Sequence, residues 1–102
     1  MDVRYSYHKD PLNPRRILAV ARRWQPGDKE ATFALAICNP KDQFSKKRAH
    51  LMLLGRLDKR EDVAIVDGEP PLAAVLRAIA TTDWYPMCAR RIAGASVRKP
   101  KA

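Results

Sequence analysis

The stretch ILAVARRWQPGDKEATFALAIC, residues 17–38, decides the fold of this chain. Its two arms, residues 17–24 and 31–38, are apolar runs of strand length that flank a polar connection. Within that connection Pro26-Gly27 suits the two central positions of a type II turn, because proline presets the first position and glycine adopts positive φ at the second. The sequence therefore predicts an antiparallel β-hairpin.

Small and large side chains alternate along this hairpin, so its two faces differ. Successive side chains of a strand point to opposite faces, which places alanines on one face and larger apolar residues on the other. The alanines are Ala19, Ala21, Ala34 and Ala36, and the larger residues of the second arm are Phe33, Leu35 and Ile37. Since both faces are apolar, we expect helices to cover much of the sheet, with a dimer interface on one face as the alternative.

The residues that follow the hairpin predict a helix with a well-defined start. Asn39 stands at the N-cap position, Pro40 at the first helical position and Asp42 three residues after the cap. We therefore expect the helix to begin within two residues of Pro40. Basic residues fill its first half and apolar residues its second half, so we expect the first half to protrude and the second to be buried.

Weaker patterns predict the remaining elements. Alternating polarity predicts a strand over residues 3–8, and a short apolar run predicts another over residues 63–66. Apolar residues at helical spacing predict an amphipathic helix that starts near Pro71. A last helix is expected from Asp83 to about Ala93, with Gly94 as its end. Its expected anchors on the core are Trp84, Tyr85 and Met87.

These elements indicate one small α+β domain over residues 1–94, followed by a basic, flexible tail over residues 95–102. The expected order is strand, strand, strand, helix, strand, helix, helix. A central antiparallel hairpin sheet would be packed by two or three helices. The sequence leaves the oligomeric state open.

The strongest compositional feature is a net charge of +9, from 20 Lys and Arg against 11 Asp and Glu. A positive field on so small a body favours acidic partners, with nucleic acid first and an acidic protein face or anionic lipid after it. The candidate nucleic-acid-binding residues form three groups, which are Lys46, Lys47 and Arg48; Arg22 and Arg23; and Arg90 and Arg91. Tyr5, Tyr7 and Trp24 are candidates for stacking on unpaired bases. Whether the three groups share one surface stays open.

Catalysis, metal binding and membrane insertion have no support in the sequence. The chain has no GxSxG, GxGxxG or P-loop motif, and its two cysteines and two histidines lie outside ligand spacing. We therefore predict no catalytic residue, no metal site and no cofactor, with Cys38 and Cys88 as reduced thiols. No apolar run approaches the length of a membrane span, and the first residues lack the apolar core of a signal peptide. We expect a cytosolic protein without membrane contact.

The segment AICNPKDQFSKKRAHLMLLGRL, residues 36–57, resembles a pattern found in short proteins of phages and other mobile elements. In those proteins a strand ends in a Cys-x-Pro-Lys-Asp-x-Phe-x-Lys-Lys phrase, and a helix then runs to a Gly-Arg pair. The resemblance implies a phage-encoded protein, and such proteins include nucleic-acid binders and inhibitors of host defence, such as anti-CRISPR proteins. We expect non-catalytic binding of nucleic acid or a nucleoprotein through a basic surface. The alternative is steric inhibition of a host protein.

Overall fold

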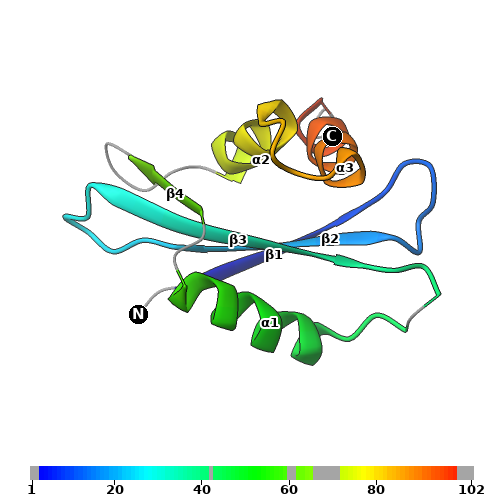
Figure 1. Ribbon diagram of the computed structural model, residues 1–102, viewed down its shortest axis with the longest axis horizontal. Helices are drawn as coiled ribbons and strands as arrows, with labels where there is room; N and C mark the ends of the chain where they lie inside the picture. The colour runs from blue at the N-terminus through cyan, green and yellow to red at the C-terminus, as the bar shows by residue number, and fades with distance from the viewer. Residues whose placement is uncertain (1–2, 42, 60–61, 66–71, 99–102) are drawn as a thin grey trace.

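The computed structural model describes residues 3–41, 43–59, 62–65 and 72–98, and it confirms the α+β class and the predicted order of elements (Figure 1). The elements in chain order are β1 (Val3–Lys9), β2 (Ile17–Arg23), β3 (Glu30–Cys38), α1 (Lys46–Asp58), β4 (Asp62–Ile65), α2 (Leu72–Thr81) and α3 (Met87–Arg98). The strands predicted over residues 3–8, 17–24, 31–38 and 63–66 thus correspond to β1, β2, β3 and β4.

The strands form one antiparallel sheet in the order β1-β2-β3-β4. In the central hairpin Ile17 pairs with Cys38, so β2 begins where β3 ends. Gly27 has a φ of 93°, and the N–H of Asp28 donates to the carbonyl of Gln25 at 2.9 Å. This geometry is the one predicted for the Pro26-Gly27 turn.

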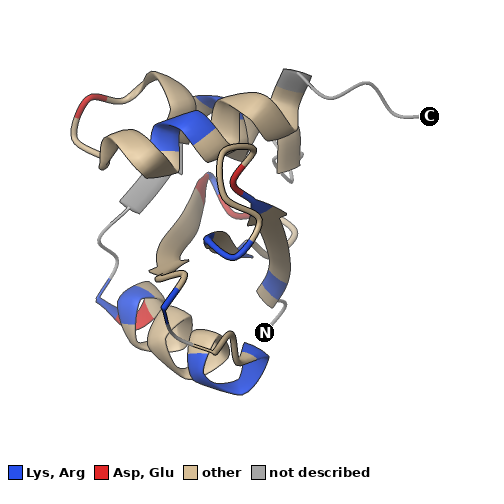
Figure 2. Ribbon diagram, turned by 90° about the vertical axis from the view of Figure 1, so that its right-hand side faces the viewer, with Lys and Arg blue, Asp and Glu red and all other residues tan. Residues whose placement is uncertain are grey.

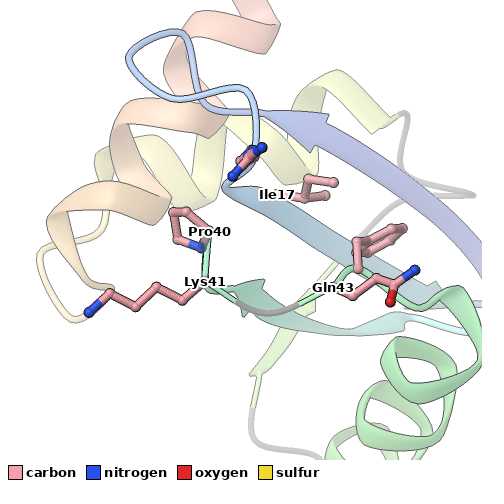
Figure 3. A pocket seen from close by; sticks show the side chains of 6 residues that line it. Ile17, Pro40, Lys41 and Gln43 are labelled. Carbon is pink, nitrogen blue, oxygen red and sulfur yellow. The ribbon is translucent and has the colours of Figure 1, made fainter.

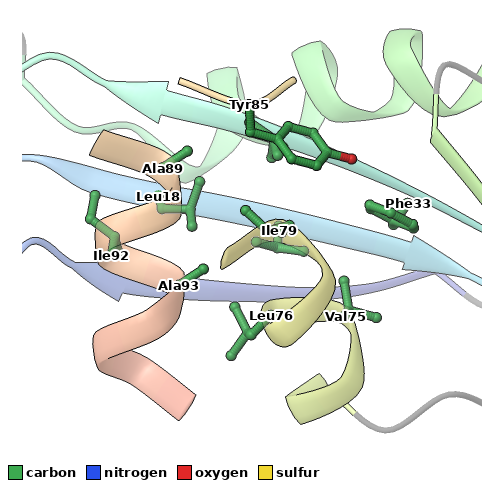
Figure 4. Packing of buried hydrophobic residues seen from close by; sticks show 11 residues of the cluster. Leu18, Phe33, Val75, Leu76, Ile79, Tyr85, Ala89, Ile92 and Ala93 are labelled. Atoms are coloured by element: carbon green, nitrogen blue, oxygen red, sulfur yellow. The ribbon is translucent and has the colours of Figure 1, made fainter. Parts of the chain in front are cut away.

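Helices cover both faces of the sheet, as the apolar residues of the hairpin predict. Helix α1 packs against the alanine face, where small side chains let it come close (Figure 1). Helices α2 and α3 pack against the other face, where Leu18 and Phe33 meet Ile79 and Ile92 (Figure 4). The alanine face buries Leu53 and Leu57 of α1 completely. The sheet is therefore the middle layer of three.

The predicted start of α1 was wrong. The helix begins at Lys46, and its N-cap is Ser45, whose hydroxyl accepts the N–H of Arg48 at 3.3 Å. The side chain of Asn39 instead accepts the N–H of Lys41 at 3.0 Å, which closes a local turn two residues on. Asp42, the other half of the predicted cap, lies outside the described residues.

The predicted division of α1 into a protruding half and a buried half was also wrong. Because the helix lies along the sheet, it buries one stripe at spacing i, i+4 rather than one half. Leu53 and Leu57 are fully buried, whereas Leu51, Met52 and Leu54 of the same half are 65%, 51% and 39% exposed.

Helix α3 corrects two further predictions. It continues through Gly94 to Arg98, so Gly94 does not end the helix and residues 95–98 are not part of a tail. A glycine inside a helix is disfavoured by only about 1 kcal/mol relative to alanine, which packing can offset. Of the three predicted anchors Tyr85 is buried, but Trp84 and Met87 are both 72% exposed. Residues 99–102 lie outside the described part.

The assignment of Ser45 as the N-cap of α1 can be tested by mutation. Ser45→Ala should lower the free energy of unfolding by about 0.5–2 kcal/mol, because the first turn of α1 loses the acceptor of the Arg48 N–H. Asn39→Ala is the matched control, since the side chain of Asn39 accepts a hydrogen bond from Lys41 in its own turn and not from the first turn of α1 as described. Urea denaturation of both variants measures the difference. A larger loss for Asn39→Ala than for Ser45→Ala would contradict this assignment of the cap.

Candidate nucleic-acid interface

The end of the molecule where α1 begins faces the viewer in Figure 2. Several Lys and Arg residues at this end have exposed side chains. The pairing of Ile17 with Cys38 brings the β1–β2 connection and the β3–α1 connection to this end. The first of these connections contributes Arg15, and the second contributes Lys41. The start of α1 contributes three consecutive cations. We define the basic end as Arg15, Lys41, Lys46, Lys47 and Arg48, all of which are exposed.

Among the described residues, no acidic side chain pairs with the cations of the basic end. Within the part of the chain that the structure describes, none of its five cations is in an ion pair. Most of the described acidic residues lie elsewhere. Asp28 and Glu30 lie in and after the β2–β3 turn at the opposite end of the sheet, Asp58 ends α1, and Asp83 follows α2. The described acidic residue nearest the basic end in the chain is Asp10.

Asp10 is buried, and its carboxylate is paired with two arginines outside the basic end. Its negative charge therefore does not neutralise the cations of the basic end. Asp10 is 1% exposed and accepts hydrogen bonds from Arg91 at 2.7 and 3.2 Å, from Arg16 at 3.1 Å and from the N–H of Leu12 at 2.9 Å. The bonds from Arg91 in particular lower the pKa of this carboxyl to about 2, against the opposing effect of burial. Asp10 thus ties the β1–β2 connection to α3.

The other two predicted basic groups are not part of the basic end. Arg91 is held by Asp10, and Arg90 is 3.3 Å from Asp83. Arg22 and Arg23 stand at the far end of β2, roughly 20 Å from Ile17 at the usual rise per strand residue. Arg23 also donates to the carbonyl of Leu57 at 3.2 Å and lies 3.5 Å from Asp58. Of the three groups, only Lys46, Lys47 and Arg48 lie at the basic end, whereas Arg22 lies opposite Arg4 of β1 at the far end of the hairpin.

An aromatic cluster adjoins the start of α1. The rings of Tyr5 and His50 stack with centroids 3.8 Å apart, and the Tyr7 hydroxyl is hydrogen-bonded to Nε2 of His50. Phe44 meets Tyr7 edge to face at 5.5 Å, and Nζ of Lys46 lies 5.1 Å from the centre of the Tyr7 ring. Burial, and then the proximity of Tyr5, raise the pKa of Tyr7, which keeps its phenol neutral. The cluster places the ring of Tyr7 beside the cation of Lys46.

The sequence did not predict this cluster, because His50 has no partner at a spacing that the sequence reveals. Tyr5 and Tyr7 do alternate onto one face of β1, which is a readable signal. The position of His50 depends on how α1 crosses the alanine face. That contact joins residues 43 positions apart, and no local pattern predicts it.

Two adjoining cavities open beside these side chains. The first has a volume of about 400 Å³ and is shown in Figure 3. It is lined by Arg15, Ile17, Pro40, Lys41, Gln43 and Phe44. The second, of about 290 Å³, has Ala36 of β3 and Ala49 of α1 in its wall and shares Gln43 and Phe44 with the first. Sequence reasoning named neither Gln43 nor Phe44 as a site residue, although the predicted hairpin already brings Ile17 next to Cys38.

The described residues were also compared with the requirements of a metal site, a disulfide and a membrane span. No group of three or more His, Cys, Asp or Glu side chains is placed there to hold a metal ion, and both cysteines are free thiols. No helix among these residues has the length and apolar character that a membrane span needs. Comparisons of the chain with protein-family models, with curated proteins and with solved structures found no match.

Proposed function

We propose that this protein binds nucleic acid, alone or within a nucleoprotein complex, through its basic end. The observation that supports this most is the convergence of five exposed cations, free of ion pairs among the described residues, with an aromatic cluster. Phosphate binding needs Lys and Arg side chains that reach one shared surface, and bases stack on aromatic rings. The basic end supplies the cations, and the adjoining aromatic cluster supplies the rings.

The local geometry favours several phosphate contacts rather than one. Lys46, Lys47 and Arg48 are consecutive in a helix, so their side chains leave the axis about 100° apart. They therefore reach different points along a phosphate backbone. Arg15 and Lys41 extend the cationic surface from the helix across the cavity that they line. The phosphate backbone of a nucleic acid can therefore extend from the start of α1 to the β1–β2 and β3–α1 connections.

Exposed apolar side chains favour a second candidate function, the steric inhibition of a host protein. Leu51 and Met52 on α1, and Trp84 and Met87 near α3, are each more than half exposed. Met and aromatic residues are enriched at protein interfaces. The phage or mobile-element origin implied by residues 36–57 suits either function, and it stays a prediction together with the cytosolic location.

Salt dependence tests the proposed function. If all five cations of the basic end contact phosphate, the log–log slope of affinity against salt should be about −4.5 for duplex DNA and about −3.5 for a single strand. Fluorescence anisotropy with labelled oligonucleotides of unrelated sequences, from ~50 to ~300 mM salt, measures this slope. Absence of binding at the lowest salt, with salt-tolerant capture of one defined protein, would instead support the inhibitor function.

A further inference from the structure

We infer that the cavity beside Phe44 takes up an unpaired base, which makes single-stranded nucleic acid the preferred ligand. This inference rests on the proposed function and names its ligand class. The cavity of about 400 Å³ falls in the range of small-ligand sites, and its wall combines three kinds of chemistry. Two cations, an exposed amide and apolar surface surround one space.

Each part of the wall matches a part of a nucleotide. Phe44 offers a ring on which a base can stack, and Ile17 and Pro40 add apolar surface. The amide of Gln43 both donates and accepts hydrogen bonds, which suits the polar edge of a base. Arg15 and Lys41 are exposed and can contact the phosphates on either side. Figure 3 shows Ile17, Pro40, Lys41 and Gln43 around this space.

The position of the Phe44 ring is set before any ligand arrives. Phe44 is half-buried, and its ring meets Tyr7 edge to face at 5.5 Å, while Tyr7 is hydrogen-bonded to His50 on α1. A ring held in this way loses little freedom when a base stacks on it. The second cavity is lined by both Phe44 and Arg48, so a cation of α1 borders the space next to the first cavity.

Such a cavity discriminates against duplex. A base inside a double helix is paired and stacked, and its extrusion costs a few kcal/mol before it can enter. An unpaired base enters without this cost. Because every base has a π face, stacking on Phe44 should show little sequence preference. The cations contact phosphate in either form, so duplex binding should persist at lower affinity.

The test compares Phe44→Leu, which keeps an apolar side chain but removes the ring, with Phe44→Trp, which keeps a ring. We expect wild type to bind a single strand more tightly than a duplex of equal length. Phe44→Leu should lose roughly 5- to 150-fold in single-strand affinity, with duplex affinity and salt slope unchanged. Phe44→Trp should retain the affinity, and its added fluorescence should be quenched by the strand. Trp84→Leu, at an aromatic residue that is 72% exposed, is the matched control.

The outcomes separate this inference from the proposed function. If Phe44→Leu binds single strands as wild type does, the inference is overturned and the proposed function stands. If wild type binds neither form at low salt, the proposed function fails. If circular dichroism shows that Phe44→Leu does not fold, Gln43→Ala replaces it in the same binding measurements, because the side chain of Gln43 is exposed. Lower single-strand affinity with unchanged duplex affinity supports the inference, and unchanged single-strand affinity overturns it.

Discussion

Replacing Asp10 with alanine should lower the free energy of unfolding by about 3 kcal/mol, because the change leaves Arg16, Arg91 and the N–H of Leu12 without their shared acceptor. The carboxylate is buried, and it joins the β1–β2 connection to a helix 81 residues later. Asp83→Ala is the matched control, since its carboxylate is fully exposed and pairs with a single arginine. Chemical denaturation should show almost no change for the control and a large change for Asp10→Ala.

The same carboxylate should make stability depend on acid. Its pKa is lowered to about 2 in the folded protein, against about 3.9 for an unperturbed aspartate. Asp10 therefore contributes this stability in full above about pH 4 and loses it as the pH falls through about 2. The gap between wild type and Asp10→Ala should narrow over that interval. A gap that stays constant from neutral pH to pH 2 would show that the ionised carboxylate is not what stabilises this contact.

The hairpin was predictable because its determinants are local. Alternating side chains set the faces of β2 and β3, and Pro26-Gly27 sets the turn between them. The start of α1 was not predictable in this way, because two local caps compete. Asn39 followed by Pro40 matches the statistical preference, whereas Ser45 lacks an acidic partner three residues on. In the structure the side chain of Asn39 closes a local turn, and the helix starts only after Ser45, whose hydroxyl accepts the Arg48 N–H.

The residues of the candidate site also differ in whether local sequence predicts them. Lys46, Lys47 and Arg48 form a run that the sequence shows directly. The roles of Arg23 and Arg91 depend on acceptors 34 and 81 residues away, so their engagement in the fold could not be predicted from neighbours. The proximity of Arg15 and Lys41 is partly predictable from the sequence. Their proximity follows from the register of the hairpin, once that register is extended into the connections at its end.

The largest expected effect on binding comes from replacing Lys46, Lys47 and Arg48 together with alanine. Each phosphate contact contributes close to a factor of ten at ~0.1 M salt, so affinity for duplex should fall by roughly 10²-fold or more. The log–log slope should become shallower by about two to three contacts. Stability should change little, because all three side chains are exposed. Loss of folding, measured by circular dichroism, would instead show that these residues support the structure.

The most direct test compares this variant with a second triple variant of equal charge, Lys29→Ala, Lys59→Ala and Arg77→Ala. These three residues are exposed and lie at the opposite end of the sheet, at the end of α1 and on α2. Both variants lose three cations from a net charge of +9, so bulk charge cannot distinguish them. The measurement is the salt slope of oligonucleotide binding by anisotropy. We predict a shallower slope for the basic-end variant and the wild-type slope for its control, whereas equal slopes in the two variants would contradict binding through the basic end.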